Sequence, residues 1–133
     1  MLDLFRDNFM SIKRTKSVLV TGGANGIGEA VAKTFLKNGY AVSILDVDKK
    51  GCQRFRKWAK RNGFFNFLAI EADITELELH SKIISDIEKI NGPVGILVNN
   101  TGIGTSKSIA ATKPEDYDAV WQTNIRGPFF LTQ

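Results

Sequence analysis

Short apolar runs alternate with longer amphipathic segments along most of the chain. Four runs, at residues 17–21, 40–45, 66–71 and 95–99, are rich in β-branched and other apolar residues and do not alternate in polarity. Such runs are typical of strands buried on both faces of a parallel sheet. The segments that follow them carry apolar residues at helical spacing, which predicts helices over 26–38, 49–62, 75–91 and 114–133.

Capping residues indicate where the predicted helices begin and end. Gly39 follows the first helix and can supply the positive φ of a residue just past a helix end. Capping boxes are predicted at two helix starts, Thr75 with Glu78 and Thr112 with Glu115.

The helix over 75–91 has the clearest apolar stripe, formed by Leu79, Ile83, Ile87 and Ile90. His80 is predicted on the polar side of this helix, and it is the only histidine in the chain. We therefore expect a surface residue rather than a metal ligand or a catalytic base.

A strand followed by a helix, four times over, predicts an α/β fold with a doubly wound parallel sheet. Right-handed crossovers leave few topologies, and we expect the strand order 3-2-1-4. The 133 residues have room for one domain, which we place at residues 17–133. The opening residues 1–9 are too short and too charged for a signal peptide, and we expect a disordered leader over residues 1–16.

Charge and cysteine content narrow the function classes. The net charge is +4, and seven basic residues fall within residues 49–61 with no acidic residue among them. A solvated helix face is the favoured interpretation, and a polyanion-binding surface is the alternative; a nucleic-acid partner is not favoured. Cys52 is the only cysteine, which excludes an intrachain disulfide and a zinc site built from cysteines, and no metal site is predicted. No apolar run approaches the roughly 20 residues of a membrane span, and we expect a cytoplasmic protein.

A glycine-rich segment, Thr-Gly-Gly-Ala-Asn-Gly-Ile-Gly at residues 21–28, joins the first strand to the first helix. Gly22 would allow a sharp turn, Gly26 a close approach to a pyrophosphate, and Gly28 close packing of the helix on the strand. The helix N-terminus would direct unpaired N–H groups at the phosphates. An ordinary tight turn could also carry such glycines, but Asp46, 18 residues beyond Gly28, favours a dinucleotide site.

Asp46 ends the second strand, where its carboxylate can accept hydrogen bonds from both ribose hydroxyls of an adenosine. It would repel a 2′-phosphate, and neither Asn25 nor Val47 supplies the cation that an NADP site normally has. The sequence therefore favours NAD over NADP. A role for Asp46 as N-cap of the next helix is compatible with this one.

The glycine spacing, Gly-x-x-x-Gly-x-Gly after Thr21, resembles that of the short-chain dehydrogenase/reductase family, whose nucleotide-binding domain is of Rossmann type. Three further segments resemble motifs of the same family, in the same order along residues 17–133: Asp73-Ile74, Asn99-Asn100-Thr101-Gly102 and Asn124-Ile125-Arg126-Gly127.

The resemblance implies a role for each matching position. The implied cofactor-binding residues are Gly22, Asn25, Gly26, Ile27 and Gly28 at the pyrophosphate, Asp46 and Val47 at the adenosine ribose, Asp73 and Ile74 at the adenine, and Asn100 and Gly102 at the ribose side. Asn124 matches the asparagine of the catalytic tetrad, which holds a water in the proton relay. Thr101 departs from the family's alanine and adds bulk at that position.

The family's chemistry also requires a serine and a Tyr-x-x-x-Lys pair, one helical turn apart. Tyr40 is followed four residues later by Ile44, and Tyr117 by Trp121, so neither tyrosine forms that pair. The resemblance thus implies an incomplete domain of an NAD-dependent oxidoreductase of alcohols or ketones, inactive by itself. The alternative is a truncated, non-catalytic protein that binds a dinucleotide or pairs with a partner. We also expect self-association, because the apolar strand at 95–99 would form an open edge.

Overall fold

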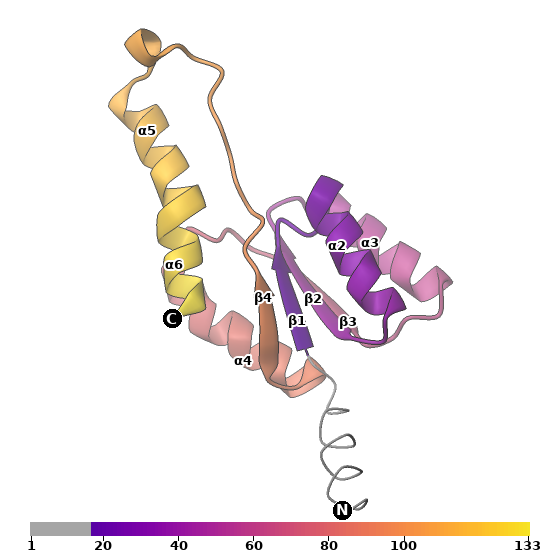
Figure 1. The fold of residues 1–133 in the computed structure, drawn as a ribbon. Helices are drawn as coiled ribbons and strands as arrows, with labels where there is room; N and C mark the ends of the chain where they lie inside the picture. The colour runs from indigo at the N-terminus through magenta and orange to yellow at the C-terminus, as the bar shows by residue number, and fades with distance from the viewer. Residues whose placement is uncertain (1–16) are drawn as a thin grey trace, which may run out of the picture.

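A computed structural model describes residues 17–133, and the predicted leader lies outside the described residues. The domain is built on a four-stranded parallel sheet with the order β3-β2-β1-β4, which confirms the predicted topology (Figure 1). The strands are β1 (Ser17–Thr21), β2 (Ala41–Asp46), β3 (Phe67–Glu71) and β4 (Val94–Val98).

Helices follow each strand as predicted. They are α2 (Gly26–Lys37), α3 (Lys49–Arg61), α4 (His80–Asn91), α5 (Pro114–Trp121) and α6 (Gly127–Thr132). Short 3-10 turns, η1 (Leu77–Leu79) and η2 (Ile109–Ala111), precede α4 and α5, and a π-helical segment, η3 (Gln122–Arg126), joins α5 to α6. The predicted last helix therefore forms as two α-helices, α5 and α6, with a π-helical segment between them. None of the helices formed by residues 17–133 combines the length and the apolar character that a membrane span requires.

The sheet has an apolar cluster on each face, because successive side chains of a strand point to opposite sides. Val18 and Val20 of β1 pack with α2 and α3, where Phe55 is fully buried. Leu19 lies on the other face, in a cluster with Ile87 of α4 and Leu131 of α6. Figure 1 shows these two helix pairs on opposite sides of the sheet, so the domain has the three layers of a doubly wound fold.

Strand β4 lies at one edge of the sheet and pairs only with β1 among the described strands. Its apolar residues are half-buried, whereas every residue of β1 is buried. The chain after β4 and helix α5 extend away from the sheet (Figure 1). Large apolar side chains stay exposed along this arm, namely Ile109, Tyr117, Trp121, Ile125, Phe129 and Phe130. The sheet edge and the arm therefore carry an incompletely covered set of apolar side chains.

The start of α4 differs from the prediction. The helix begins at His80 rather than Thr75, and no capping box forms, because Asp73 Oδ1 accepts the Thr75 N–H at 2.8 Å. Of the four residues between Thr75 and His80, Leu77–Leu79 form a 3-10 segment instead. The buried face of α4 consists of His80, Ile83, Ile87 and Asn91, so it keeps the two central isoleucines of the predicted stripe. His80 is buried, with 6% exposed, and Ile90 is 61% exposed, so both expectations were wrong.

The second predicted capping box, Thr112 with Glu115, is also absent. The hydroxyl of Thr112 donates to the Ser108 carbonyl at 2.9 Å, and α5 begins at Pro114 as predicted, with Lys113 rather than Thr112 as its N-cap residue. Asp116 then accepts the Lys113 N–H at 3.1 Å, so the carboxylate that closes the first turn lies one residue beyond the predicted one. Asp48, rather than Asp46, is the N-cap residue of α3.

Candidate cofactor site

The glycine-rich loop makes the turn from β1 into α2. Gly22 and Gly26 have φ values of 62° and 53°, in the left-handed region that favours glycine. The Gly22 N–H donates to the Leu45 carbonyl at 2.8 Å, which ties the loop to the end of β2. A Cβ at Gly28 would collide with the Gly22 carbonyl oxygen, so this position admits no side chain without displacing the backbone of the loop.

Asn100, in the segment after β4, holds the same loop from the other side. Its Nδ2 donates to the carbonyl oxygens of Thr21 and Gly22 at 3.0 and 3.1 Å. The Thr21 hydroxyl in turn accepts the N–H groups of Asn100 and Thr101 at 3.0 and 3.1 Å. The ends of β1 and β4, far apart in sequence, are thereby joined beneath the loop.

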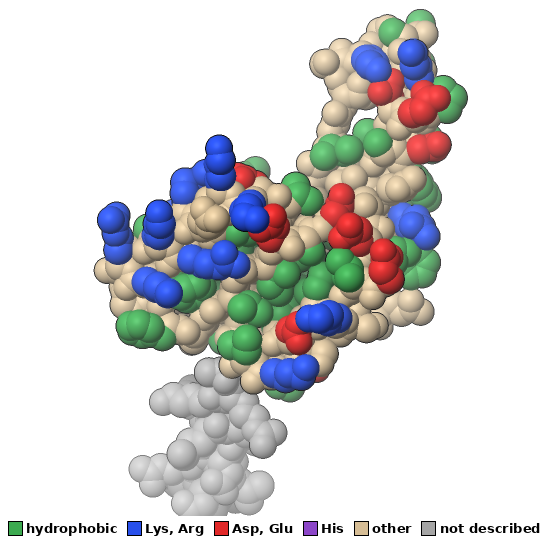
Figure 2. Space-filling model, turned by 180° about the vertical axis from the view of Figure 1, so that it is seen from behind, with side chains coloured by type: hydrophobic (Ala, Val, Ile, Leu, Met, Phe, Trp, Pro, Cys, Tyr) green, Lys and Arg blue, Asp and Glu red, His purple; other side chains and the backbone are tan. Residues whose placement is uncertain are grey.

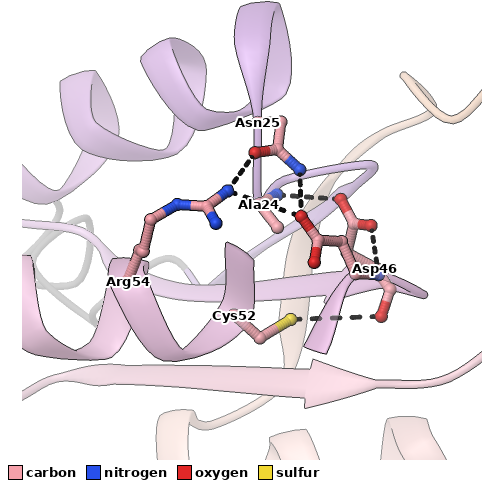
Figure 3. A network of polar contacts seen from close by, with 6 residues as sticks. Ala24, Asn25, Asp46, Cys52 and Arg54 are labelled. Carbon is pink, nitrogen blue, oxygen red and sulfur yellow. Dashed lines mark hydrogen bonds and ion pairs between the residues drawn. The ribbon is translucent and has the colours of Figure 1, made fainter. Parts of the chain in front are cut away.

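The Asp46 carboxylate is positioned by two backbone N–H groups. Oδ2 accepts from Ala24 N at 3.0 Å, and Oδ1 accepts from Asp48 N at 2.9 Å (Figure 3). Each oxygen retains a lone pair, so the half-buried carboxylate can still accept hydrogen bonds from a diol. Asp46 therefore combines a fixed position next to the glycine-rich loop with free acceptor capacity.

Three polar side chains form a network beside Asp46. Asn25 Nδ2 donates to Asp48 Oδ2 at 2.9 Å, and Arg54 Nη2 donates to Asn25 Oδ1 at 2.6 Å and to Asp48 Oδ2 at 3.4 Å (Figure 3). The hydrogen bond from Asn25 is the largest influence that lowers the pKa of Asp48, followed by the Gly51 backbone and, more weakly, Arg54. Since the side chains of Asp48 and Arg54 are 37% and 59% exposed, their ion pair contributes little to stability.

Arg54 was missed by the reasoning from sequence, which sought a cation only at positions 25 and 47. It lies eight residues beyond Asp46 on α3, and the packing of α3 against the loop brings it to Asn25. Gly51 makes this packing possible, because a Cβ there would lie 2.7 Å from Asp48 Oδ2 and 2.8 Å from the Cβ of Ala24. Gly51, a glycine in the first turn of a predicted helix, was the sequence signal that could have indicated close packing of this helix against the loop.

Seven cations lie on α3, and Figure 2 shows Lys and Arg side chains gathered over this part of the surface. Lys49 and Arg54 pair with Glu71 and Asp48, and the Arg56 guanidinium donates to the Ala69 carbonyl. Within residues 17–133 no ion pair is formed by the remaining four, which are Lys50, Lys57, Lys60 and Arg61. These four are exposed and face solvent.

A cleft of about 270 Å³ opens at the carboxyl ends of the strands. Its lining residues are Gly22, Leu45, Asp46, Val47, Ala72, Asp73, Ile74, Thr101, Ile103 and Thr123. Five of these residues were singled out from the sequence, and they lie at the ends of three different strands: Gly22, Asp46, Val47, Asp73 and Ile74.

The other singled-out residues lie around this cleft rather than in its lining. Asn25, Gly26 and Ile27 are exposed at the start of α2, with 78% of Ile27 accessible, and Gly28 is buried beneath them. Asn100 is half-buried under the loop, where its side chain is bonded to Thr21 and Gly22.

Asn124 lies in the π-helical segment and pairs with the backbone of the opposite wall. Its Oδ1 accepts the Ile103 N–H at 2.8 Å, and its Nδ2 donates to the Ile103 carbonyl at 2.9 Å. Gly102 is close, since a Cβ there would lie 3.6 Å from Asn124 Oδ1. The side chain of Asn124 therefore holds the segment after β4 against the arm.

The start of α2 fits a pyrophosphate. Asn25 is the N-cap residue but makes no side-chain cap hydrogen bond, because its side chain is bonded to Asp48 and Arg54. The first N–H groups of α2 thus lack a side-chain acceptor, and the helix directs the positive end of its dipole there. No heavy atom outside the immediate chain neighbours would lie within 4 Å of a Cβ at Gly26, so space for an anion is open.

Neither a metal site nor a reactive cysteine is found in the described part of the chain. Residues 17–133 contain no group of three or more His, Cys, Asp or Glu side chains that could hold a metal ion. Burial, ahead of the charge of Asp46, raises the pKa of the Cys52 thiol to about 11, so this thiol is a poor nucleophile.

Comparisons with known sequences agree with the geometry. The family model described as short chain dehydrogenase matches residues 16–133. A short chain dehydrogenase of Pseudocercospora fijiensis is 33% identical over 130 residues, which cover 96% of this chain and 41% of that protein. An NAD-dependent glycerol dehydrogenase of Listeria innocua is 32% identical over 119 residues, or 89% of this chain and 45% of that protein. The chain spans somewhat less than half the length of these two relatives.

Solved structures extend the comparison to the fold. A 3-ketoacyl-(acyl-carrier-protein) reductase from Brucella melitensis, complexed with NADH, has a TM-score of 0.80 and 36% identity over 88% of this chain and 47% of its own. An actinorhodin polyketide ketoreductase with NADPH has a TM-score of 0.83 and 26% identity over 89% of this chain and 45% of its own. With the matched family model and the shared Rossmann-type sheet, these likenesses lead to one conclusion: the chain belongs to the short-chain dehydrogenase/reductase family of oxidoreductases.

Proposed function

We propose that this chain binds a nicotinamide dinucleotide across the carboxyl ends of its strands, with the adenosine in the cleft beside Asp46. The observation that carries the proposal is the fixed Asp46 carboxylate, which faces the glycine-rich loop and keeps two acceptor sites. Gly22, Asn25, Gly26, Ile27 and Gly28 would surround the pyrophosphate, Asp46 and Val47 the adenosine ribose, and Asp73 and Ile74 the adenine, while Asn100 and Gly102 would present their backbone to the ribose side.

Calorimetric titration of NAD⁺ and NADH against the purified chain tests this proposal. We expect saturable binding that is weakened by the Asp46→Ala substitution. The Asp86→Ala substitution is a matched control, because Asp86 is an acid of α4 that pairs with Lys82 and Lys89 and does not line the cleft. Equal affinities of the Asp46→Ala variant and the unaltered chain would contradict the proposal.

NAD rather than NADP is the dinucleotide that the charge pattern favours. A carboxylate at Asp46 can accept from a ribose 2′-hydroxyl but repels a 2′-phosphate. Family membership alone does not select between them, since one similar structure holds NADH and another NADPH. Parallel titrations with NAD⁺ and NADP⁺ should show the tighter binding for NAD⁺, and the Asp46→Ala substitution should narrow the difference.

The reaction that we propose for the whole protein is hydride transfer between the nicotinamide and an alcohol or ketone. When bound, the dinucleotide supplies the hydride donor or acceptor, and Asn124 is the one tetrad position that this chain provides. We therefore expect the purified 133-residue chain to form no NADH with a panel of secondary alcohols. Turnover above background would refute that expectation.

A second candidate is a non-catalytic protein that binds a dinucleotide or pairs with a partner chain. It is favoured by the open edge of β4 and by the exposed apolar side chains of α5 and α6. In this case the purified chain should self-associate. Sedimentation combined with hydrogen exchange tests this, and a monodisperse monomer with a strongly protected β4 would contradict it. A reducing, cytoplasmic location is part of both proposals, in keeping with a single buried free thiol.

A further inference from the structure

His80 is a buried polar residue that the proposed binding of a dinucleotide leaves without a role. Its imidazole is 6% exposed, and Nε2 lies 2.9 Å from the carbonyl oxygen of Ile74. A carbonyl oxygen can only accept, so Nε2 carries the proton and donates it to this bond. The other ring nitrogen, Nδ1, is buried and has no hydrogen-bond partner among the described residues. The imidazole is thus committed to a single backbone carbonyl.

That carbonyl belongs to a wall of the cleft. Asp73 and Ile74 line the cleft on the side where we place the adenine, and they follow the end of β3 at Glu71. The last backbone bond between this wall and the sheet is from Ala72 N to Asp46 O, at 3.2 Å. Beyond Ala72 the wall is held by side-chain packing and local hydrogen bonds rather than by backbone bonds to the sheet.

Two neighbouring helices confine the Ile74 carbonyl. His80 approaches it from the first turn of α4, and Gly127 approaches it from α6, where a Cβ would lie 2.7 Å from the same oxygen. The Ile74 side chain is itself 3% exposed and belongs to the cluster between the sheet, α4 and α6. The peptide after Ile74 is therefore held on both sides, with the only side-chain hydrogen bond to its carbonyl coming from His80 within the described chain.

We propose that His80 is a positioning residue for the adenosine end of the dinucleotide. Its N–H fixes the Ile74 carbonyl and thereby the orientation of the Asp73–Ile74 wall. His80 does not line the cleft, so its effect on a ligand passes through Ile74. This inference rests on the proposed function. It attributes the orientation of the adenine-binding wall to a residue that the family motifs do not include.

The test compares variants of the full chain for binding of ADP-ribose, which carries the adenosine end and the pyrophosphate, and of nicotinamide mononucleotide. His80→Leu removes the donor and leaves a buried acceptor unpaired, so we expect the Kd for ADP-ribose to rise about tenfold. Binding of nicotinamide mononucleotide should change less than twofold. His80→Gln places an amide N–H at a similar reach and should restore ADP-ribose binding to within about threefold of the unaltered chain.

Asn91→Leu is the matched control at the other end of α4. Asn91 is also 6% exposed, and its Nδ2 donates to the Ser43 hydroxyl at 3.0 Å, away from the cleft. The Asn91→Leu variant should be less stable than the unaltered chain but should bind ADP-ribose with the same affinity. Hydrogen exchange adds a readout without ligand: His80→Leu should accelerate exchange of the amides at residues 73–77, and Asn91→Leu should not.

Each outcome either supports the inference or overturns it. If ADP-ribose does not bind to the unaltered chain, the proposed function fails and the role of His80 fails with it. If it binds equally well to the unaltered chain and to His80→Leu, only the role of His80 is overturned. If His80→Leu does not fold, His80→Gln and His80→Asn decide, because the shorter asparagine cannot reach the carbonyl; equal affinities of these two would refute the positioning role.

Discussion

The substitution Asn100→Asp tests the link between the glycine-rich loop and β4 most directly. It keeps the shape of the side chain but replaces a donor with an acceptor. In the structure, Nδ2 of Asn100 donates to the carbonyl oxygens of Thr21 and Gly22 at 3.0 and 3.1 Å. After the change, an oxygen faces these two carbonyl oxygens, and both hydrogen bonds are lost.

The expected cost follows from these two contacts. Each lost hydrogen bond contributes about 0.5–1.5 kcal/mol to the free energy of unfolding, which gives about 1–3 kcal/mol for the pair. Repulsion between the carboxylate and the two carbonyl oxygens places the total at the upper end, about 3 kcal/mol at pH 7. For a domain of this size, that loss lowers Tm by on the order of 10 °C.

Thermal unfolding followed by circular dichroism measures this effect, with Asn99→Asp as the control. Asn99 is the adjacent residue and undergoes the same change of charge, but it is exposed and makes one side-chain hydrogen bond, to the Thr132 hydroxyl at 3.2 Å. We expect the control to change the free energy of unfolding by less than about 0.5 kcal/mol, as most surface substitutions do.

The deficit of the Asn100→Asp variant should also depend on pH. A protonated carboxyl can donate one hydrogen bond to a carbonyl, so folding raises the pKa of the new carboxyl above its ordinary value of about 3.9. The free energy of unfolding of the variant is then closest to that of the unaltered chain below about pH 3.9, and it falls as pH rises through the pKa of the carboxyl in the folded state. The deficit should be smaller at pH 4 than at pH 7. Melting temperatures of the two Asp variants that agree within about 2 °C at pH 7 would refute the reasoning.

Three further predictions concern other parts of the site. Arg54→Ala should weaken binding of NADP⁺ severalfold and of NAD⁺ less than twofold in calorimetry, because Arg54 is a cation of the network beside Asp46; equal effects would contradict this. The pKa of the Cys52 thiol is raised from 9.0 to about 11, so the thiol should not react with Ellman's reagent at pH 8 until the chain unfolds. The raised pKa favours the folded state below pH 9, and this contribution to the free energy of unfolding is lost as pH rises toward 11. Gly28→Ala should lower the free energy of unfolding by about 2 kcal/mol in urea titrations despite the better helix propensity of alanine, whereas Gly104→Ala, with no heavy atom near its Cβ, should be neutral.

Elements and topology were predictable because the signals for them are local. Val18, Leu19 and Val20 form a continuous apolar run, and such a run is stable only where both faces of a strand are covered. The positive φ at Gly39 follows the end of the first helix, where glycine had predicted it. The right-handed crossover then leaves the observed strand order as one of very few choices.

Helix starts were less predictable, because several side chains compete for the same backbone groups. Thr75 and Glu78 have the spacing of a capping box, but the Asp73 carboxylate takes the Thr75 N–H and the helix begins at His80. The buried face of α4 then runs through His80, Ile83, Ile87 and Asn91. Apolar periodicity does not report this face fully, because two of these four residues are polar.

The sequence by itself determined the strands, their order, the glycine-rich loop and the carboxylate at the end of β2. Each of these depends on the properties of neighbouring residues: apolar content, the conformational freedom of glycine, and the place where a strand stops. The tertiary structure alone decided that Arg54 reaches Asn25 and that His80 bonds to the wall of the cleft. Such contacts depend on the rotation of one element against another, and packing of the whole domain, rather than any local pattern, sets that rotation.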